Sequence, residues 1–299
     1  MKIVRITLLL CLLLSLWGMP TQAQSTFAKV QKKQEMLATG KQAYINRCSG
    51  CHGLNGDGKG AGAKMLNPKP RDFTKGIFKF KSTPIGEMPT DDDLLTVINT
   101  GVNGTSMPSF LLVSDAEKRA LVEYIKTFAQ DSWKRQSPEK VVPPLKMPTH
   151  VFAKKSELLE SAKRGRLWFQ ELGCVTCHGA TGQGNGASAA TLKDAWGNDI
   201  LPGNLTKRYV KRGYRVQDVA YSIANGVDGT PMPAHVEVLQ SLEGQFPELK
   251  DKGYIWDLTA FVFYLRGQEA GLYSNEVAPI PADGIPQEEV MQTIGKYFQ

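Results

Sequence analysis

The sequence has few of the residues that most often build metal sites and disulfide frameworks: 4 of its 299 residues are histidine and 5 are cysteine. No run of about 20 apolar residues follows its first segment, so no later part of the chain is expected to span a membrane. The charge balance is modest, because 36 basic residues stand against 29 acidic ones. A surplus of this size does not predict a nucleic-acid partner. The informative residues are therefore concentrated at a few positions.

The first residues have the three parts of a secretory signal peptide. A basic start is followed by an apolar run, Ile6–Trp17, and by the small residue Ala23 at a suitable cleavage position. The run has about a dozen residues, so an uncleaved membrane anchor is the less favoured interpretation. Cys11 lies inside this run, which is the wrong place for the lipid-bearing first residue of a lipoprotein. We expect residues 1–23 to be removed and the mature chain to lie in the periplasm or an equivalent extracytoplasmic compartment.

The mature chain would have 276 residues, 299 minus 23, enough for two domains with cores of their own. Its formal charge would be 34 minus 29, or +5. The excess lies in residues 24–136, which have 17 basic and 11 acidic residues, whereas residues 137–299 have 17 and 18. Such a surplus can steer an acidic protein partner, and it can equally be an ordinary solvated surface.

All cysteines of the mature chain lie in two stretches with the same spacing, "CSGCHGLNGDGKG" at residues 48–60 and "CVTCHGATGQGNG" at residues 174–186. Disulfides do not call for the histidine that follows each pair. A thioredoxin-like site would need a strand before the motif and a helix after it, whereas glycine-rich loops follow both pairs. Zinc would need four ligands, and each stretch has three obvious ones. The pattern C-x-x-C-H is the attachment signature of c-type haem, so two covalently bound haem c groups with their iron are the favoured prediction.

The haem interpretation assigns a role to each residue of the motif. Two thiols on one short helical turn would bond to the haem, and the next residue would supply an imidazole nitrogen to its iron. The predicted attachment residues are Cys48, Cys51, Cys174 and Cys177, and the predicted iron ligands are His52 and His178. We expect a backbone carbonyl to hold the other ring nitrogen of each histidine. The matching segments "KPRDFT" and "LPGNLT", near Pro70 and Pro202, are the best places for it.

A second iron ligand is predicted from the matching segments "GVNGTSMPSF" and "GVDGTPMPAH". Met107 follows His52 by 55 residues, and Met232 follows His178 by 54. A lone methionine is more often a core residue, but two in the same frame indicate ligands. Met88 is the rival in the first half, and its frame is not repeated in the second.

The two other histidines carry less weight. His235 stands three residues beyond Met232 and is a possible substitute ligand, although a surface or loop histidine is the favoured interpretation. His150 lies in a proline-rich segment with Met147 nearby, and neither is expected to bind iron.

The repeat extends to the helices around each motif. Segments 35–47 and 157–172 have the apolar spacing of amphipathic helices. Further helices are predicted over 115–130, where Ser114 would cap the start, and over 254–267, where Gly267 would follow the last turn. In each half we expect the first helix to cross the last, with Gly40 and Gly165 allowing close approach and with Tyr124 and Phe261 filling the crossings.

These features together resemble class I c-type cytochromes, duplicated as in dihaem electron carriers, over most of residues 31–267. The resemblance implies a mostly α fold of two tandem domains, each a few helices around one haem with histidine and methionine ligands. The expected domains are 24–136 and 155–267, joined by the proline-rich linker 137–154 and followed by a tail, 268–299. An insertion between Met232 and the last helix, around residues 238–253, departs from the first half. The tail contains a possible helix, Gln287–Phe298, and is either a strap on its own protein or a handle for another subunit.

The expected function is electron transfer and not catalysis, because histidine and methionine would fill both free iron positions and exclude substrate. The partners would be a redox enzyme and a respiratory complex, with the protein acting as a free carrier or as a subunit of a larger oxidoreductase complex. The basic segment 64–81 is a candidate docking surface. Arg71 and Trp196 are candidates for haem propionate bonds. The alternative function is a dihaem peroxidase, which would need one iron with an open position.

Overall fold

A computed structural model describes residues 21–135, 152–207, 211–212, 215–235, 254–269, 271–272, 276–281 and 283–294. Within these ranges the protein is helical and has no strand, and one isolated bridge joins Lys193 and Asp199. The expected mostly α fold is confirmed. No helix in the described part of the chain is long and apolar enough to cross a membrane. The predicted signal sequence up to residue 20, most of the linker and the insertion at 238–253 lie outside the described residues.

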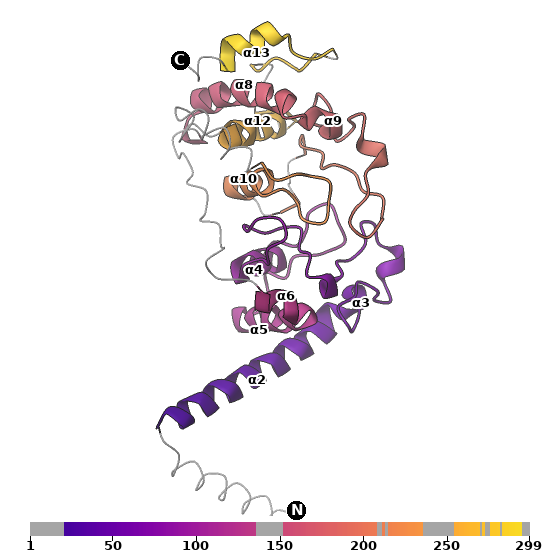
Figure 1. Cartoon of the computed structure of the whole chain (residues 1–299), viewed down its shortest axis with the longest axis vertical. Coiled ribbons are helices and arrows are strands. Elements are labelled where there is room, and N and C mark those ends of the chain that lie inside the picture. The colour runs from indigo at the N-terminus through magenta and orange to yellow at the C-terminus, as the bar shows by residue number, and fades with distance from the viewer. Residues whose placement is uncertain are drawn as a thin grey trace, which may run out of the picture.

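The first half of the chain contains one long helix and several short ones (Figure 1). They are α2 (Thr21–Arg47), α3 (Ser49–His52), α4 (Asp91–Thr100), α5 (Asp115–Lys126) and α6 (Gln130–Arg135). Ser114 caps α5 by accepting a hydrogen bond from the backbone N–H of Glu117, as predicted. α2 begins well before the predicted segment, and its first turns are exposed and extend away from the rest of the protein.

Within the described residues, the second half repeats four of these helices, shows no counterpart of α6, and adds α13. Its helices are α8 (Lys155–Glu171), α9 (Cys174–His178), α10 (Val216–Ala224), α12 (Tyr254–Glu269) and α13 (Gln287–Ile294). The prediction that α12 ends before Gly267 is wrong, because the helix includes Gly267 and continues to Glu269. Glycine is tolerated there, and the Gly267 carbonyl accepts a hydrogen bond from the backbone N–H of Leu272.

Each half is held together by one helix crossing, α2 with α5 and α8 with α12. A Cβ atom on Gly40 would lie 2.0 Å from the Ala120 carbonyl oxygen and 2.9 Å from Cβ of Tyr124. A Cβ atom on Gly165 would lie 2.0 Å from the Asp257 carbonyl oxygen and 2.9 Å from Cβ of Phe261. The predicted close approach at both glycines is confirmed, as are the two aromatic residues at the crossings.

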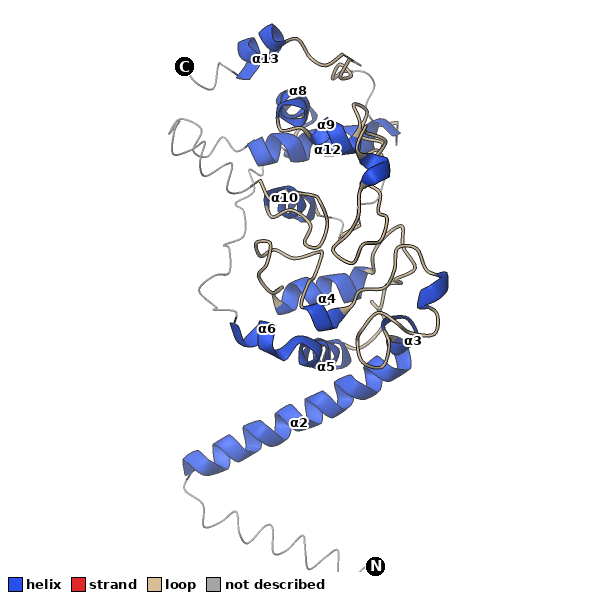
Figure 2. Cartoon of the chain, turned by 45° about the vertical axis from the view of Figure 1, so that its right-hand side comes forward, coloured by secondary structure: helices blue, strands red, loops and turns tan. Residues whose placement is uncertain are grey.

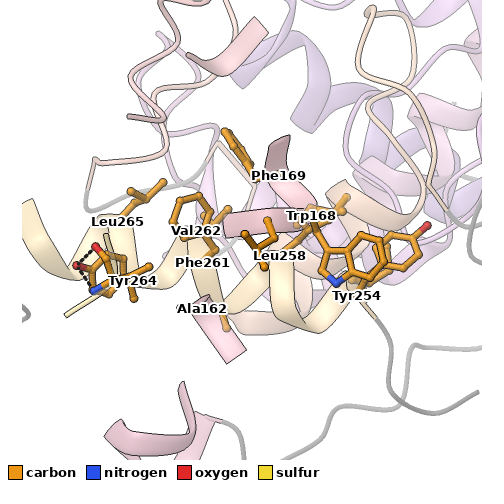
Figure 3. Close-up of a cluster of buried hydrophobic side chains, with 14 of the residues drawn as sticks. Ala162, Trp168, Phe169, Tyr254, Leu258, Phe261, Val262, Tyr264 and Leu265 are labelled. Atoms are coloured by element: carbon orange, nitrogen blue, oxygen red, sulfur yellow. Dashed lines mark hydrogen bonds between the residues drawn. The ribbon is translucent and has the colours of Figure 1, made fainter. Parts of the chain in front are cut away.

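The core of the second half lies mainly between α8 and α12 (Figure 3). The Phe169 and Phe261 rings meet edge to face at 5.4 Å, and the Trp168 and Tyr254 rings lie 5.3 Å apart. Contacts of this geometry add to the stabilisation from burying the rings. The first half has a separate core, which includes Tyr44, Phe73, Phe78 and Leu121.

The order of the helices in space is reversed between the two halves. From one end of the molecule to the other it runs α8, α12, α10, α4, α5 and α2, so that α10 and α4 occupy the centre (Figures 1 and 2). α13 lies outside α8 (Figure 1). The two halves therefore meet through their middle helices and the loops that flank them.

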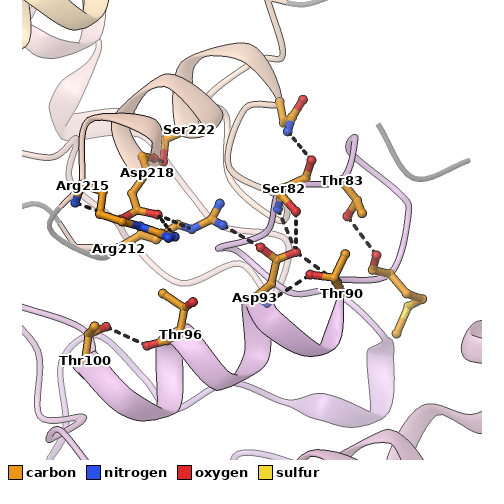
Figure 4. A network of polar contacts seen from close by, with 12 residues as sticks. Ser82, Thr83, Thr90, Asp93, Thr96, Thr100, Arg212, Arg215, Asp218 and Ser222 are labelled. Atoms are coloured by element: carbon orange, nitrogen blue, oxygen red, sulfur yellow. Dashed lines mark hydrogen bonds and ion pairs between the residues drawn. The ribbon is translucent and has the colours of Figure 1, made fainter. Parts of the chain in front are cut away.

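Buried charges join the two halves at this centre (Figure 4). Arg212 donates to Asp93 at 2.6 Å and lies 3.9 Å from Asp218. Asp93 and Asp218 both stand at the third position of their helices, α4 and α10, where each also accepts a backbone hydrogen bond that stabilises the helix start. The side-chain amide of Asn225 donates to the Ser82 carbonyl at 2.9 Å. Hydrogen bonds and ion pairs therefore fix the two halves against each other.

A second buried ion pair lies beside the first. The Lys81 ammonium, on a residue that is 3% exposed, lies 2.8 Å from a carboxylate oxygen of Asp228. The same carboxylate accepts the backbone N–H of Gly86 at 3.1 Å. Lys81 belongs to the basic segment 64–81, so part of the predicted docking surface binds the second half of its own chain. Lys64, Lys69 and Lys75 of that segment remain exposed.

The described part of the C-terminal tail lies against α8. The Arg166 guanidinium forms a 2.6 Å ion pair with Glu289, and the Gln170 amide donates to the Ile285 carbonyl at 3.1 Å. Four apolar side chains of the tail are buried, those of Val277, Ile280, Ile285 and Val290. Of the two alternatives for the tail, a strap on its own protein is therefore the one observed.

Candidate functional site

The two C-x-x-C-H motifs form single helical turns, α3 and α9, at the ends of the long helices α2 and α8. The two cysteines of each motif are three residues apart and so lie on one face of the turn. All four thiols are half-buried and free, in disagreement with the disulfide alternative. Burial raises the pKa of Cys48 and of Cys174 to about 11, so both are protonated thiols at neutral pH.

Each histidine of the motifs is held by a backbone carbonyl. His52 Nδ1 lies 2.9 Å from the Arg71 carbonyl oxygen, and His178 Nδ1 lies 3.0 Å from that of Gly203. A carbonyl can only accept, so the hydrogen bond requires a proton on Nδ1 and leaves the Nε2 lone pair for a metal. The carbonyls come from the two predicted segments, one residue after Pro70 and Pro202.

Burial lowers the pKa of both His52 and His178 and thereby favours the neutral ring, which is the form that binds iron. Each turn thus presents two unpaired thiols followed by an oriented, neutral imidazole. This donor set fits a covalently bound haem. In the described part of the chain, no three His, Cys, Asp or Glu side chains are grouped so as to hold a metal ion, so the zinc alternative gains no support.

The glycine-rich loops fold back onto the segments that hold the histidines. Gly58 has a φ of 73° and Gly184 a φ of 80°, in the left-handed region that favours glycine. A Cβ atom on either would lie 2.8 Å from the carbonyl oxygen of Pro70 or of Pro202. In both loops the close contact is with the protein's own backbone.

The two methionines occupy loops with the same hydrogen bonds. The backbone N–H of Met107 donates to Thr105 Oγ1, and that of Met232 donates to Thr230 Oγ1, both at 3.2 Å. Both side chains are half-buried. Met88 is different, because its side chain is 3% exposed and belongs to the core of the first half. The loop geometry therefore favours Met107 and Met232 over Met88 as the ligand pair, which stays a prediction.

The environments of the two histidines differ. The Phe73 ring stacks on His52 with centroids 4.5 Å apart and an interplanar angle of 19°. The aligned residue in the second half is Leu205, and the nearest ring to His178 in the described structure is Phe169 at 6.3 Å. The sequence shows Phe73 and Leu205 in matching frames, but nothing in it indicated that Phe73 would touch the histidine.

Of the two expected positions for His235, surface or loop, the structure shows a loop that is buried. His235 is 8% exposed. Its backbone N–H donates to the Ala224 carbonyl at 2.9 Å, and its backbone carbonyl accepts a hydrogen bond from Tyr254 Oη at 2.6 Å. Burial lowers the pKa of its ring. His235 therefore belongs to the packing of the second half. His150 and Met147 lie outside the described residues.

The structure brings together Arg71 and Trp196, which the sequence placed in different domains. The Arg71 guanidinium carbon lies 4.1 Å from the centre of the Trp196 ring. No local pattern could have predicted this pairing, because the residues belong to different halves and stand at positions that are not equivalent in the repeat.

Comparison with known proteins gives two matches. Residues 37–129 match the family model described as cytochrome c. The chain is also similar to a solved chain of the "Kuenenia stuttgartiensis reducing HAO-like protein complex Kustc0457/Kustc0458", with 31% sequence identity and a TM-score of 0.63. The alignment covers 76% of this chain and 95% of that one. No curated protein matches the chain.

Proposed function

Because the chain belongs to the cytochrome c family, we propose that it carries electrons between two protein partners and uses a haem in each half. The family implies haem c with iron as the cofactor. The family match covers residues 37–129, and the second half is assigned by the features that it shares with the first. The observation that carries the proposal is the repetition of one arrangement, in which a C-x-x-C-H turn has its histidine held by a carbonyl and is followed by a methionine loop.

In each half, different residues would attach the haem and bind its iron. Cys48 and Cys51 would attach the haem of the first half, and Cys174 and Cys177 would attach that of the second. The haem supplies an iron that can gain or lose one electron. His52 and His178 would each supply an imidazole nitrogen to an iron, with their ring orientation set by the carbonyl contacts. Met107 and Met232 would each supply a thioether sulfur as a further ligand, which would leave no iron position open to substrate.

We further propose that the protein works outside the cytoplasm, after removal of residues 1–23, and that it receives and passes one electron at a time. It can do so as a free carrier or as a subunit of a redox complex. The similar solved chain belongs to a complex of two proteins, which favours the subunit. The exposed lysines of segment 64–81, Lys64, Lys69 and Lys75, are the part of that segment that remains open to a partner.

The test is to replace each predicted methionine ligand in the full-length mature holoprotein. Met107→Ala and Met232→Ala should each convert one of two six-coordinate haem signals to a changed spin state and lower its midpoint potential, because thioether sulfur stabilises the reduced iron. Absorption and paramagnetic resonance spectra with a redox titration would measure both effects.

Met88→Leu is the matched control, because it keeps the core volume and should leave both haem signals unchanged. If Met88→Leu altered a haem signal and Met107→Ala did not, the ligand assignment in the first half would be wrong. A high-spin ferric signal in the unmodified protein at rest, together with rapid reaction with peroxide, would support the peroxidase alternative instead.

A further inference from the structure

The residue that orients the histidine differs between the halves. In the aligned segments "KPRDFT" and "LPGNLT", the carbonyl comes from Arg71 in the first half and from Gly203 in the second. The residues that follow play the same part, because Asp72 and Asn204 each accept a backbone hydrogen bond at 2.9 Å from the threonine two positions on. The backbone is therefore alike in the two segments, and only the first has a side chain at the position that holds the histidine.

That side chain reaches the other half of the protein. The Arg71 guanidinium carbon lies 4.1 Å from the centre of the Trp196 ring, and Arg71 is half-buried. Burial lowers the pKa of Arg71 to about 10, while the negative charges of Asp194 and Asp228 oppose the shift. Arg71 remains a cation at neutral pH. A cation on an aromatic face is held more strongly when water is excluded, so the contact fixes the guanidinium in place.

Trp196 is tied in turn to the loop that carries Met232. The backbone N–H of Ala195 donates to the Gly229 carbonyl at 3.0 Å. The Trp196 ring packs on Gly229, where a Cβ atom would lie 3.0 Å from the ring. Gly229 stands three residues before Met232 in the same turn. One chain of contacts therefore leads from the His52 ring through Arg71 and Trp196 to the Met232 loop.

The charged interface keeps this chain of contacts in one arrangement. The Lys81–Asp228 pair lies beside it, and Asp228 directly precedes Gly229 in the Met232 loop. Breaking such a pair leaves a buried charge without compensation, which is strongly unfavourable. Arg71 therefore contacts the second half next to a buried ion pair that joins the two halves.

We propose that Arg71 is a positioning residue that couples the iron sites of the two halves, with its carbonyl orienting His52 and its guanidinium fixed on Trp196 beside the Met232 loop. The inference rests on the proposed function, in that it requires an iron at each site. A positive charge in a poorly solvated position favours reduction of a nearby iron more than the same charge in water would. Because the charge is fixed between the halves, it raises the potentials of both sites. The contacts that lead from His52 to the Met232 loop would let a change at one site affect the potential of the other.

The experiment is a redox titration of the full-length mature holoprotein, in which the two ferric signals are assigned with Met107→Ala and Met232→Ala. Arg71→Leu should lower the midpoint potential of both sites. Trp196→Leu leaves the charge but removes its support, and should weaken the dependence of one potential on the oxidation state of the other. Arg71→Lys keeps the charge and loses the planar contact, so it should weaken the dependence between the two potentials as Trp196→Leu does. It replaces Arg71→Leu in the test if that variant fails to fold.

Lys75→Leu is the matched control, because it removes the same charge from an exposed position in the same segment. It should move neither potential beyond the error of the titration. The inference is overturned if Lys75→Leu and Arg71→Leu shift the potentials equally, because net charge alone would then explain the effect. It is also overturned if Trp196→Leu and Arg71→Lys lower the unfolding temperature but leave both potentials and their coupling unchanged. A mature protein with fewer than two haems would instead contradict the proposed function itself.

Discussion

At the scale of single residues, local patterns in the sequence predicted the contacts that are local in the chain. The carbonyls that hold His52 and His178 come from the predicted segments, because the C-x-x-C-H turn and its loop bring a following segment back within 19 and 25 residues. The pairing of Arg71 with Trp196 could not be predicted, because it depends on how the halves pack. The same reason explains His235, whose burial depends on Tyr254 and the core of the second half.

Asp257 of α12 is expected to make stability depend on pH. It is buried, accepts hydrogen bonds from Ser161 at 2.7 Å and from Arg164 at 2.8 Å, and has a pKa raised by burial to about 6 from 3.8. The folded state therefore holds this proton more tightly than the unfolded state. Its contribution to the free energy of unfolding should rise as pH falls from above 6 to near 4, by about 3 kcal/mol at most.

Chemical unfolding of the holoprotein at several pH values would measure this effect by comparison with Asp257→Asn. The difference in unfolding free energy between the two proteins should change steadily between pH 7 and pH 4. Replacement of the exposed Asp131 by Asn is the control and should give a difference that varies little. A constant difference for Asp257→Asn over this range would contradict the prediction.

At the scale of helices, the sequence predicted the long helices before and after each motif and the helix of the tail, but it did not predict α4 or α10. The apolar spacing and the Ser114 cap located α5, and the glycine frames located both helix crossings. The end of α12 was predicted wrongly because a glycine near the end of a helical pattern usually marks its C-terminus, whereas this packed helix includes Gly267. The extent of α2 was missed because its first turns are exposed and have no core face to give a period.

Gly40→Ala and Gly165→Ala should each separate a helix pair. The added methyl group would lie 2.0 Å from a backbone carbonyl of the opposite helix, which cannot move aside as a flexible side chain could. We expect each change to lower the free energy of unfolding by about 2 kcal/mol or more, despite the better helix propensity of alanine. Thermal and chemical unfolding would measure it.

Gly50→Ala is the control for these substitutions, because nothing lies within 4 Å of a Cβ atom there and its φ is not positive. It should change stability by about 0.5 kcal/mol or less. Equal effects at Gly40 and Gly50 would show that the helices are not packed as closely as described.

At the scale of the whole molecule, the sequence predicted two domains joined by a proline-rich linker. The described residues show that buried ion pairs fix the two halves. The partners are 119 positions apart in the Arg212–Asp93 pair and 147 apart (228 minus 81) in the Lys81–Asp228 pair. Charged residues usually indicate a solvated surface, so the sequence alone favoured solvent or an external partner for Lys81. Its burial depends on a matching carboxylate that only the packed halves supply.

Asp228→Asn should uncouple the two halves. It leaves the Lys81 ammonium buried without its counter-charge, which costs roughly 3–5 kcal/mol. Calorimetry of the holoprotein should then show two separated unfolding transitions, whereas we expect one for the unmodified protein.

The double variant Lys81→Met/Asp228→Asn should recover part of this loss, because it removes the uncompensated charge. Asp131→Asn, in an exposed pair with Lys134, should have little effect. If the single and double variants unfolded alike, the pair would not be what joins the halves.

The reversed order of the helices places α4 and α10, which hold equivalent positions in the two halves, together at the centre of the molecule. This is how a twofold dimer of identical subunits is built, with one surface facing its own copy. Within a single polypeptide the two surfaces are encoded separately and need not stay identical. One half can therefore have Arg71 where the other has Gly203. A homodimer of a half-length chain could not have this difference, because both of its subunits would have the same residue.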